Sequence, residues 1–131
     1  MKTRMFLLLT AMLVFGVALY GHHSIAGTYD QTKEIKIEGK IVQFLYRNPH
    51  AFVRIAAPDD SGAMHEWAVE WGGAAALAQQ GVNRDTFKIG DVVTITGNPG
   101  RNVEDHRLKM NTLHRKSDGF GWGTRPGEKV E

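Results

Sequence analysis

The stretch from Lys40 to Ala57, KIVQFLYRNPHAFVRIAA, constrains the fold more than any other part of the sequence. Two runs rich in Ile, Val, Phe, Leu and Tyr flank the tetrapeptide Arg-Asn-Pro-His at 47–50. Runs of β-branched and aromatic residues predict strands, and Asn-Pro is a turn-forming dipeptide. We therefore expect a long β-hairpin with His50 at its bend.

The rest of the chain predicts the remainder of a small barrel. Apolar positions of the first strand change face after Gly39, and a glycine at such a change is typical of a β-bulge or sharp bend. The expected elements are strands over 33–46, 52–57 and 64–71, a short helix over 74–80, and strands over 92–96 and 107–113. This order, β-β-β-α-β-β, predicts an all-β fold with one short helix, a five-stranded OB-type barrel.

The N-terminus has the pattern of an export signal. Lys2 and Arg4 precede a mainly apolar segment, which predicts a signal peptide over 1–21. The apolar segment is shorter than the roughly 20 residues that a membrane span needs, so no stable membrane anchor is expected after cleavage. Cleavage is expected after Gly21 or after Ala18, and the mature protein is expected to be periplasmic or secreted.

The mature chain is long enough for one domain. A polar, glycine-containing lead-in over 22–32 is expected to be extended, with little regular structure. The barrel domain is expected over 33–115. A flexible tail is expected over 116–131, in which Phe120 and Trp122 could pack onto the barrel.

Composition removes several classes of function. Without Lys2 and Arg4 of the signal peptide, the 16 basic residues become 14, equal to the 14 acidic residues. The basic patch of a nucleic-acid binder is therefore not expected. The absence of cysteine excludes thiol catalysis, zinc-thiolate sites and c-type haem attachment. No nucleophile elbow, phosphate loop or His-Glu-x-x-His motif occurs, so we expect no enzyme.

Three sets of residues carry a resemblance to a known family. They are His22-His23-Ser24, the Asn48-Pro49-His50 turn, and a spaced series between Leu77 and Pro99. Together they resemble an uncharacterised family of small exported bacterial proteins over roughly 22–113. The resemblance implies export and an OB-like domain and assigns no activity. Tyr20-Gly21 stands where an alanine would be expected before the His-His-Ser start.

The mature N-terminus is one candidate metal site. Cleavage after Gly21 would leave His22 with a free α-amine and an imidazole, next to the ring of His23. Cu(II) prefers such nitrogen ligands in tetragonal sites, and a third nitrogen from His50 or another histidine of the folded domain would complete a T-shaped copper site. Cleavage after Ala18 would remove the amine ligand, and the alternative is a solvated terminus without metal.

A binding rim is expected at one end of the barrel. In OB-type barrels, the connection between strands one and two and the connection between strands four and five flank one binding face. His50 lies on the first connection and His106 on the second, whereas His65 begins strand three at the opposite end. The expected rim is Asn48, His50, Trp71 and His106.

The expected function is that of a non-catalytic exported binding module. Its ligand is not identified by the sequence, and copper is the candidate cofactor. Trp67 and Trp71 are expected in the core rather than as a stacking platform, and Glu66 and Glu70 are expected to be solvated. The alternative is a structural or interaction domain that presents a barrel edge to a periplasmic partner protein and uses no small ligand.

Overall fold

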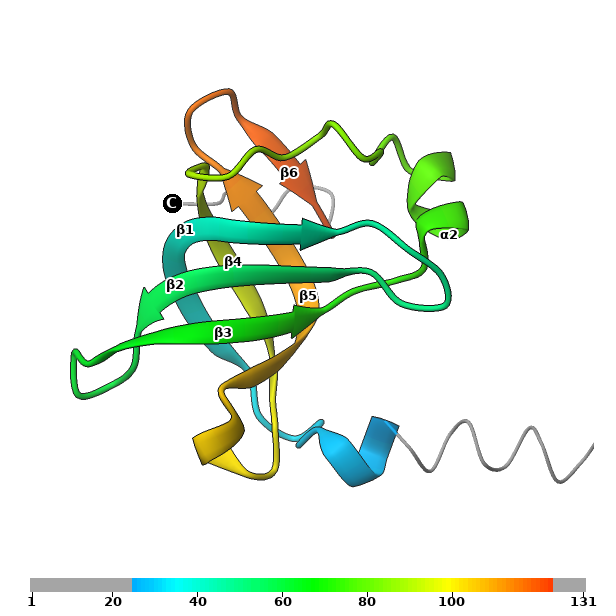
Figure 1. The fold of residues 1–131 in the computed structure, drawn as a ribbon. Helices are drawn as coiled ribbons and strands as arrows, with labels where there is room; N and C mark the ends of the chain where they lie inside the picture. Colours follow the sequence, from blue (N-terminus) through cyan, green and yellow to red (C-terminus); the bar gives the residue numbers. More distant parts are fainter. Residues whose placement is uncertain (1–24, 124–131) are drawn as a thin grey trace, which may run out of the picture.

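The computed structural model of the protein describes residues 25–123. The predicted signal peptide, the terminal histidines His22 and His23, and residues 124–131 lie outside this part. A helical turn at residues 25–28 precedes the barrel (Figure 1). The elements that follow are β1 (Ile35–Leu45), β2 (Phe52–Pro58), β3 (Met64–Glu70), α2 (Ala74–Gln79), β4 (Val92–Pro99), the 3-10 helix η1 (Val103–Asp105), β5 (Arg107–Arg115) and β6 (Phe120–Trp122).

The first five strands close into a barrel (Figure 1). β1 pairs antiparallel with both β2 and β4, β2 pairs with β3, and β4 pairs with β5. A short parallel pairing of β3 with β5, centred on Val69 and Leu108, completes the ring. These pairings are those of an OB-type barrel. The predicted all-β fold, β-β-β-α-β-β with one short helix, is therefore confirmed.

β1 pairs with two neighbours because it changes partner along its length. Residues 35–40 pair with β4, and residues 40–45 pair with β2. Gly39 lies where the two pairings meet, and a Cβ added there would lie 2.1 Å from the carbonyl oxygen of Ala56. Glycine is therefore required by the close approach of the backbones.

The bulge in β1 falls after Ile41 rather than at Gly39. In the pairing with β2, the register shifts between Ile41 and Gln43. Ile41 is buried before the shift and Phe44 packs against the core after it, whereas Val42 is exposed. The prediction that the faces change at Gly39 is thus wrong in position, because the apolar side chain of Val42 gives the pattern of an inward residue.

The core is filled by the inward residues of all five barrel strands. On β3, Trp67 and Val69 are buried while Glu66 is exposed, as the alternation of this segment predicts. Trp71, just past the strand, is 1% exposed and packs edge-on against Trp122, with ring centroids 4.9 Å apart. Both tryptophans predicted for the core are therefore in it.

The single helix predicted after β3 is present as α2. It begins after Gly73, buries Leu77 and is followed by Gly81, whose positive φ of 80° suits a helix end. The short α2 covers one end of the barrel (Figure 1). Within residues 25–123, no helix is long and apolar enough to cross a lipid bilayer.

The N-terminal lead-in is more ordered than expected in its described part. Residues 25–28 form a helical turn, and Tyr29 is 1% exposed and forms a β-bridge with Gly100. The expectation of an extended segment with little structure is corrected for residues 25–32. The physical reason is that one buried aromatic side chain anchors the segment to the barrel.

The tail expected over 116–131 also contains an element. β6 pairs with the second half of β5, and Phe120 and Trp122 pack against the core. Arg115 supports the intervening turn, because its guanidinium forms two hydrogen bonds with the carboxylate of Asp118, at 2.8 and 3.0 Å. The expectation of a flexible tail is corrected for residues 120–122, which form a strand, and the expected packing of Phe120 and Trp122 onto the barrel is confirmed.

Candidate functional site

The residues of the predicted rim lie at two ends of the barrel. Asn48, His50 and Trp71 lie together, because the bend between β1 and β2 pairs with the chain just past β3. His106 instead lies beside Trp67, with ring centroids 5.1 Å apart. β5 runs parallel to β3 and begins beside its middle, so His106 lies about four residues, or about 13 Å, along β3 from the His50 end. The structure thus does not bring His50 and His106 together.

Two of the predicted rim residues support the fold. Asn48 Oδ1 accepts a hydrogen bond from the backbone N–H of Ala75 at 3.1 Å, at the start of α2. The indole of Trp71 is enclosed in the core, and its Nε1 has no hydrogen-bond partner among residues 25–123. At this end of the barrel, His50 is therefore the predicted rim residue whose side chain faces another ionisable group.

His50 faces Glu70 at the end of β3. The distance from His50 Nδ1 to Glu70 Oε1 is 3.5 Å, and Nδ1 makes no hydrogen bond within the described part of the chain. The side chain of Glu70 is only 12% exposed, so the prediction that it is solvated is wrong. Glu66 is 53% exposed and pairs with Arg54 at the surface, as a solvated carboxylate does.

Tyr29 joins the N-terminal segment to the same carboxylate. Its hydroxyl donates a hydrogen bond to Glu70 Oε2, and the guanidinium of Arg107 lies 5.9 Å from the ring centroid. Burial, together with the hydrogen bond and the charge of Glu70, raises the pKa of the Tyr29 phenol well above its usual value. The hydrogen bond holds this segment against Glu70, whose side chain is 12% exposed.

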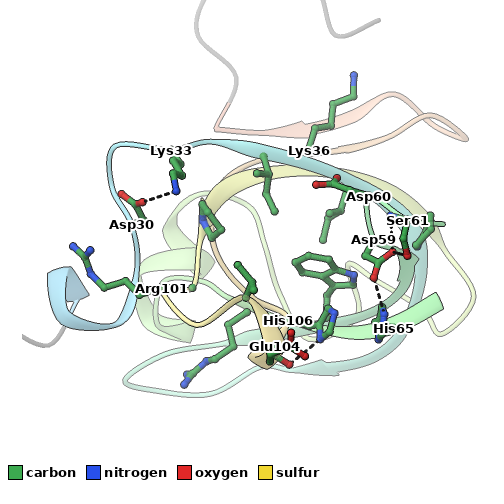
Figure 2. Close-up of a pocket in the computed structure, with 18 of the residues that line it drawn as sticks. Asp30, Lys33, Lys36, Asp59, Asp60, Ser61, His65, Arg101, Glu104 and His106 are labelled. Carbon is green, nitrogen blue, oxygen red and sulfur yellow. Dashed lines mark hydrogen bonds and ion pairs between the residues drawn. The ribbon is translucent and has the colours of Figure 1, made fainter. Parts of the chain in front are cut away.

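A cavity of about 830 Å³ opens at the other end of the barrel (Figure 2). It is bounded by the start of β1, the β2–β3 turn and the β4–β5 connection. Part of its wall is apolar and is formed by Ile35, Ile37 and Trp67. Acidic and basic side chains also line the cavity. The mixed charges favour neither an anionic nor a cationic ligand by their field alone.

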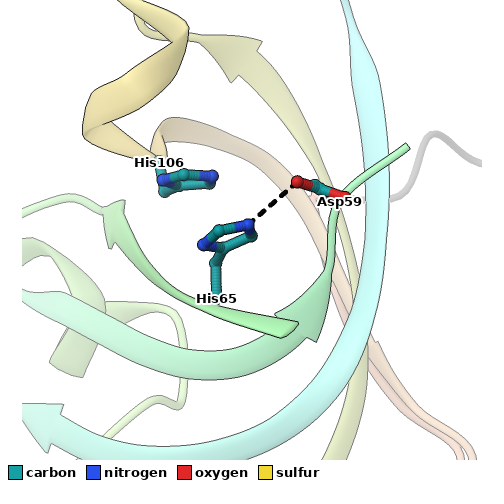
Figure 3. A group of neighbouring side chains, drawn as sticks. All are labelled: Asp59, His65 and His106. Carbon is teal, nitrogen blue, oxygen red and sulfur yellow. Dashed lines mark hydrogen bonds and ion pairs between the residues drawn. The ribbon is translucent and has the colours of Figure 1, made fainter. Parts of the chain in front are cut away.

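Asp59, His65 and His106 lie side by side at this cavity (Figure 3). One nitrogen or oxygen atom from each lies within 4.8 Å of the other two. His65 Nε2 is 2.9 Å from Asp59 Oδ2, and the His65 ring stacks on the His106 ring with centroids 3.8 Å apart. No second group of three His, Cys, Asp or Glu side chains with this spacing occurs within residues 25–123.

Local backbone structure orients two members of the cluster. Asp59 Oδ1 accepts hydrogen bonds from the hydroxyl and N–H of Ser61 and from the N–H of Ala63. The Ser61 hydroxyl is the main cause that lowers the pKa of Asp59 to about 2. His106 has a left-handed backbone with φ of 45°, and its Nδ1 lies 3.0 Å from the Glu104 carbonyl oxygen.

The cluster has only part of a signature in the sequence. The turn cluster Asp59 to Gly62 followed directly by a strand predicts a tight hairpin, which brings Asp59 near His65. No local pattern links either residue to His106. His106 is brought beside them by the parallel pairing of β3 with β5, which depends on closure of the whole barrel.

Comparison with known proteins gives a family and no activity. No curated protein and no solved structure matches the chain. A family model described as a family of unknown function, DUF6152, matches residues 11–109. This match includes the barrel from β1 to the start of β5 and confirms the resemblance to an uncharacterised family. The chain belongs to DUF6152, a family of unknown function.

Proposed function

We propose that the protein is an exported, non-catalytic binding module that holds copper at the His50 end of its barrel. The observation that carries the proposal is the pair His50 and Glu70, whose nitrogen and oxygen are 3.5 Å apart while the nitrogen is otherwise unbonded among residues 25–123. Imidazole nitrogen and carboxylate oxygen are both suitable ligands for Cu(II).

The separation of the two atoms suits a shared metal ion. Ligand atoms at about 2.0–2.1 Å from one ion lie about 2.9 Å apart in cis and about 4.2 Å apart in trans. The 3.5 Å between His50 Nδ1 and Glu70 Oε1 falls inside this range. The other oxygen of Glu70 accepts the hydrogen bond from Tyr29, the kind of outer contact that orients a ligating carboxylate.

The N-terminal segment supplies the remaining ligands in this proposal. Tyr29 is anchored on Glu70, and His22 precedes it by seven residues, a length of chain that spans at most about 25 Å. In this proposal the α-amine of His22 and the ring of His23 reach His50 across that length of chain. Export, which exposes that amine by cleavage after Gly21, is part of the same proposal.

Copper titration of the secreted protein tests the proposal. N-terminal analysis first establishes the mature start. A chain that begins at His22 should bind Cu(II) with nitrogen couplings in its electron paramagnetic resonance spectrum, at a site that His65→Ala leaves intact. His22→Ala and His50→Ala should each weaken copper binding by at least about 10- to 100-fold. That is the effect of losing a residue that only contacts a metal ligand, and loss of a ligand should cost no less. His114→Ala, on β5 beside β4 and β6, is the matched control and should bind normally.

Other outcomes decide against the proposal. Copper binding that is unchanged in both His22→Ala and His50→Ala would contradict it. Copper binding that is lost only in His65→Ala would show that the copper site is at the cavity. A periplasmic protein that co-purifies even after loss of every histidine, with no copper bound, would favour the interaction domain instead.

A further inference from the structure

The cluster at the cavity has metal-binding chemistry that the copper proposal does not use. Asp59 lies in the β2–β3 turn, His65 on β3 and His106 just before β5 (Figure 3). Together they offer one carboxylate and two imidazoles, three ligands of the kind that zinc takes. We propose that Asp59, His65 and His106 form a second metal site, independent of His50, for a divalent ion of the zinc class.

His106 keeps one ring nitrogen free of a proton. A carbonyl oxygen can only accept a hydrogen bond, so the 3.0 Å contact with Glu104 places the ring proton on Nδ1. Nε2 is then the unprotonated nitrogen that can bind a metal. Metal-ligating histidines usually donate their other N–H to a carbonyl or carboxylate in this way.

Asp59 and His65 are spaced as two cis ligands of one ion. Their donor atoms are 2.9 Å apart, which corresponds to an angle near 90° at an ion with bonds of about 2.0–2.1 Å. The angles of a tetrahedral zinc site are wider, about 109°, so binding would move the two atoms slightly apart, to about 3.3 Å. Asp59 Oδ1 is already occupied by hydrogen bonds within the turn, which leaves Oδ2 directed at His65.

Metal binding requires the two rings to leave their stack. The ring planes of His65 and His106 are 18° from parallel, and a bound metal lies in the plane of each imidazole. The donor atoms lie within 4.8 Å of one another, and ligand atoms on one ion would lie within about 4.2 Å. Both rings are partly exposed and border the cavity, which gives them room to turn.

The cavity determines what completes the coordination. Three protein ligands leave at least one position of a zinc-class ion open. Because all three side chains line the cavity, that position faces its 830 Å³ of space rather than the packed core. A water molecule, or a small ligand with a nitrogen or oxygen donor, would fill it.

Zinc titration of the mature chain tests this site, with Co²⁺ as a coloured substitute that reports its ligands. Wild type should bind zinc, and bound zinc should raise the midpoint of thermal unfolding by mass action. His65→Ala and His106→Asn should each weaken zinc binding about 100-fold or more. Loss of a residue that only contacts a metal ligand lowers metal affinity by up to about 100-fold, and loss of a ligand itself should cost at least as much. Asparagine is chosen at 106 because it tolerates the left-handed backbone there.

The controls separate this site from the copper proposal. His50→Ala and His22→Ala should leave zinc binding unchanged, so failure of the copper proposal would not affect this result. Each variant without metal should unfold at a midpoint close to that of His114→Ala, which checks that the barrel is intact. Zinc binding that survives both His65→Ala and His106→Asn, or that is lost in His50→Ala, would overturn the inference, as would no zinc binding by wild type.

Discussion

The two ends of β3 each join a histidine to a carboxylate, but in different surroundings. At the start of the strand, His65 contacts Asp59 beside an open cavity, and their side chains are 34% and 27% exposed. At its end, the Glu70 side chain is 12% exposed and lies between His50 and Tyr29. One end thus has a histidine and a carboxylate that are both partly exposed, whereas at the other end the carboxylate is covered and anchored beside a histidine that is 45% exposed. The segment packed beside each pair makes the difference.

The largest expected effect concerns the unequal packing of the two ends. Trp71, behind the His50 end, is 1% exposed, and Trp71→Ala should lower the free energy of unfolding by about 3–5 kcal/mol. Trp67 is 8% exposed and borders the existing cavity, so Trp67→Ala should lower it less. Chemical denaturation of both variants measures this difference. Equal losses would show that the two ends are supported alike.

Removal of the Tyr29 hydroxyl should destabilise the end of the barrel that contains His50 and Glu70. Tyr29→Phe loses a hydrogen bond to a carboxylate, and the free energy of unfolding should fall by roughly 1.5–3 kcal/mol. Glu66→Gln is the control, because its exposed pair with Arg54 should contribute less than about 1 kcal/mol. A similar loss in both variants would argue against a special role for the covered carboxylate.

The same hydroxyl predicts a dependence on alkaline pH. The folded protein raises the Tyr29 pKa above its usual 10.0, so the unfolded chain releases this proton first as the pH rises. The stabilisation is therefore complete below about pH 10 and is lost progressively above it. Urea denaturation at pH 8 to 11 should show this loss in wild type, and the Tyr29→Phe variant should lack that part of it.

A smaller expected effect tests the geometry of the His50 end. A Cβ at Gly73 would lie 2.5 Å from the carbonyl oxygen of Pro49 and 2.8 Å from Asn48 Oδ1. Gly73→Ala should therefore destabilise the fold by about 1–3 kcal/mol and weaken copper binding, with zinc binding unchanged. Gly72→Ala is the matched control, since a Cβ there would make only an ordinary contact with the side chain of Leu77, at 3.9 Å. Equal effects on both metals would mean that the two ends are coupled.

Much of the fold was predictable because its causes are local. The alternation in MHEWAVE places Trp67 inward and Glu66 outward without reference to any other segment. Where a distant segment intervened, the prediction failed. Glu70 has the same pattern as Glu66, yet it is covered by Tyr29, 41 residues earlier in the chain. The short β6 likewise depends on the edge that β5 offers, not on its own three residues.

The candidate sites show the same difference between local and long-range causes. The sequence alone determined a barrel with a bent hairpin and His50 at its bend, since strand periodicity and turn residues act over a few neighbours. Tertiary structure alone decided that His106 joins His65 and Asp59 rather than His50. The reason is that the parallel pairing of β3 with β5 depends on closure of the barrel, and closure is driven by burial of a core drawn from every barrel strand.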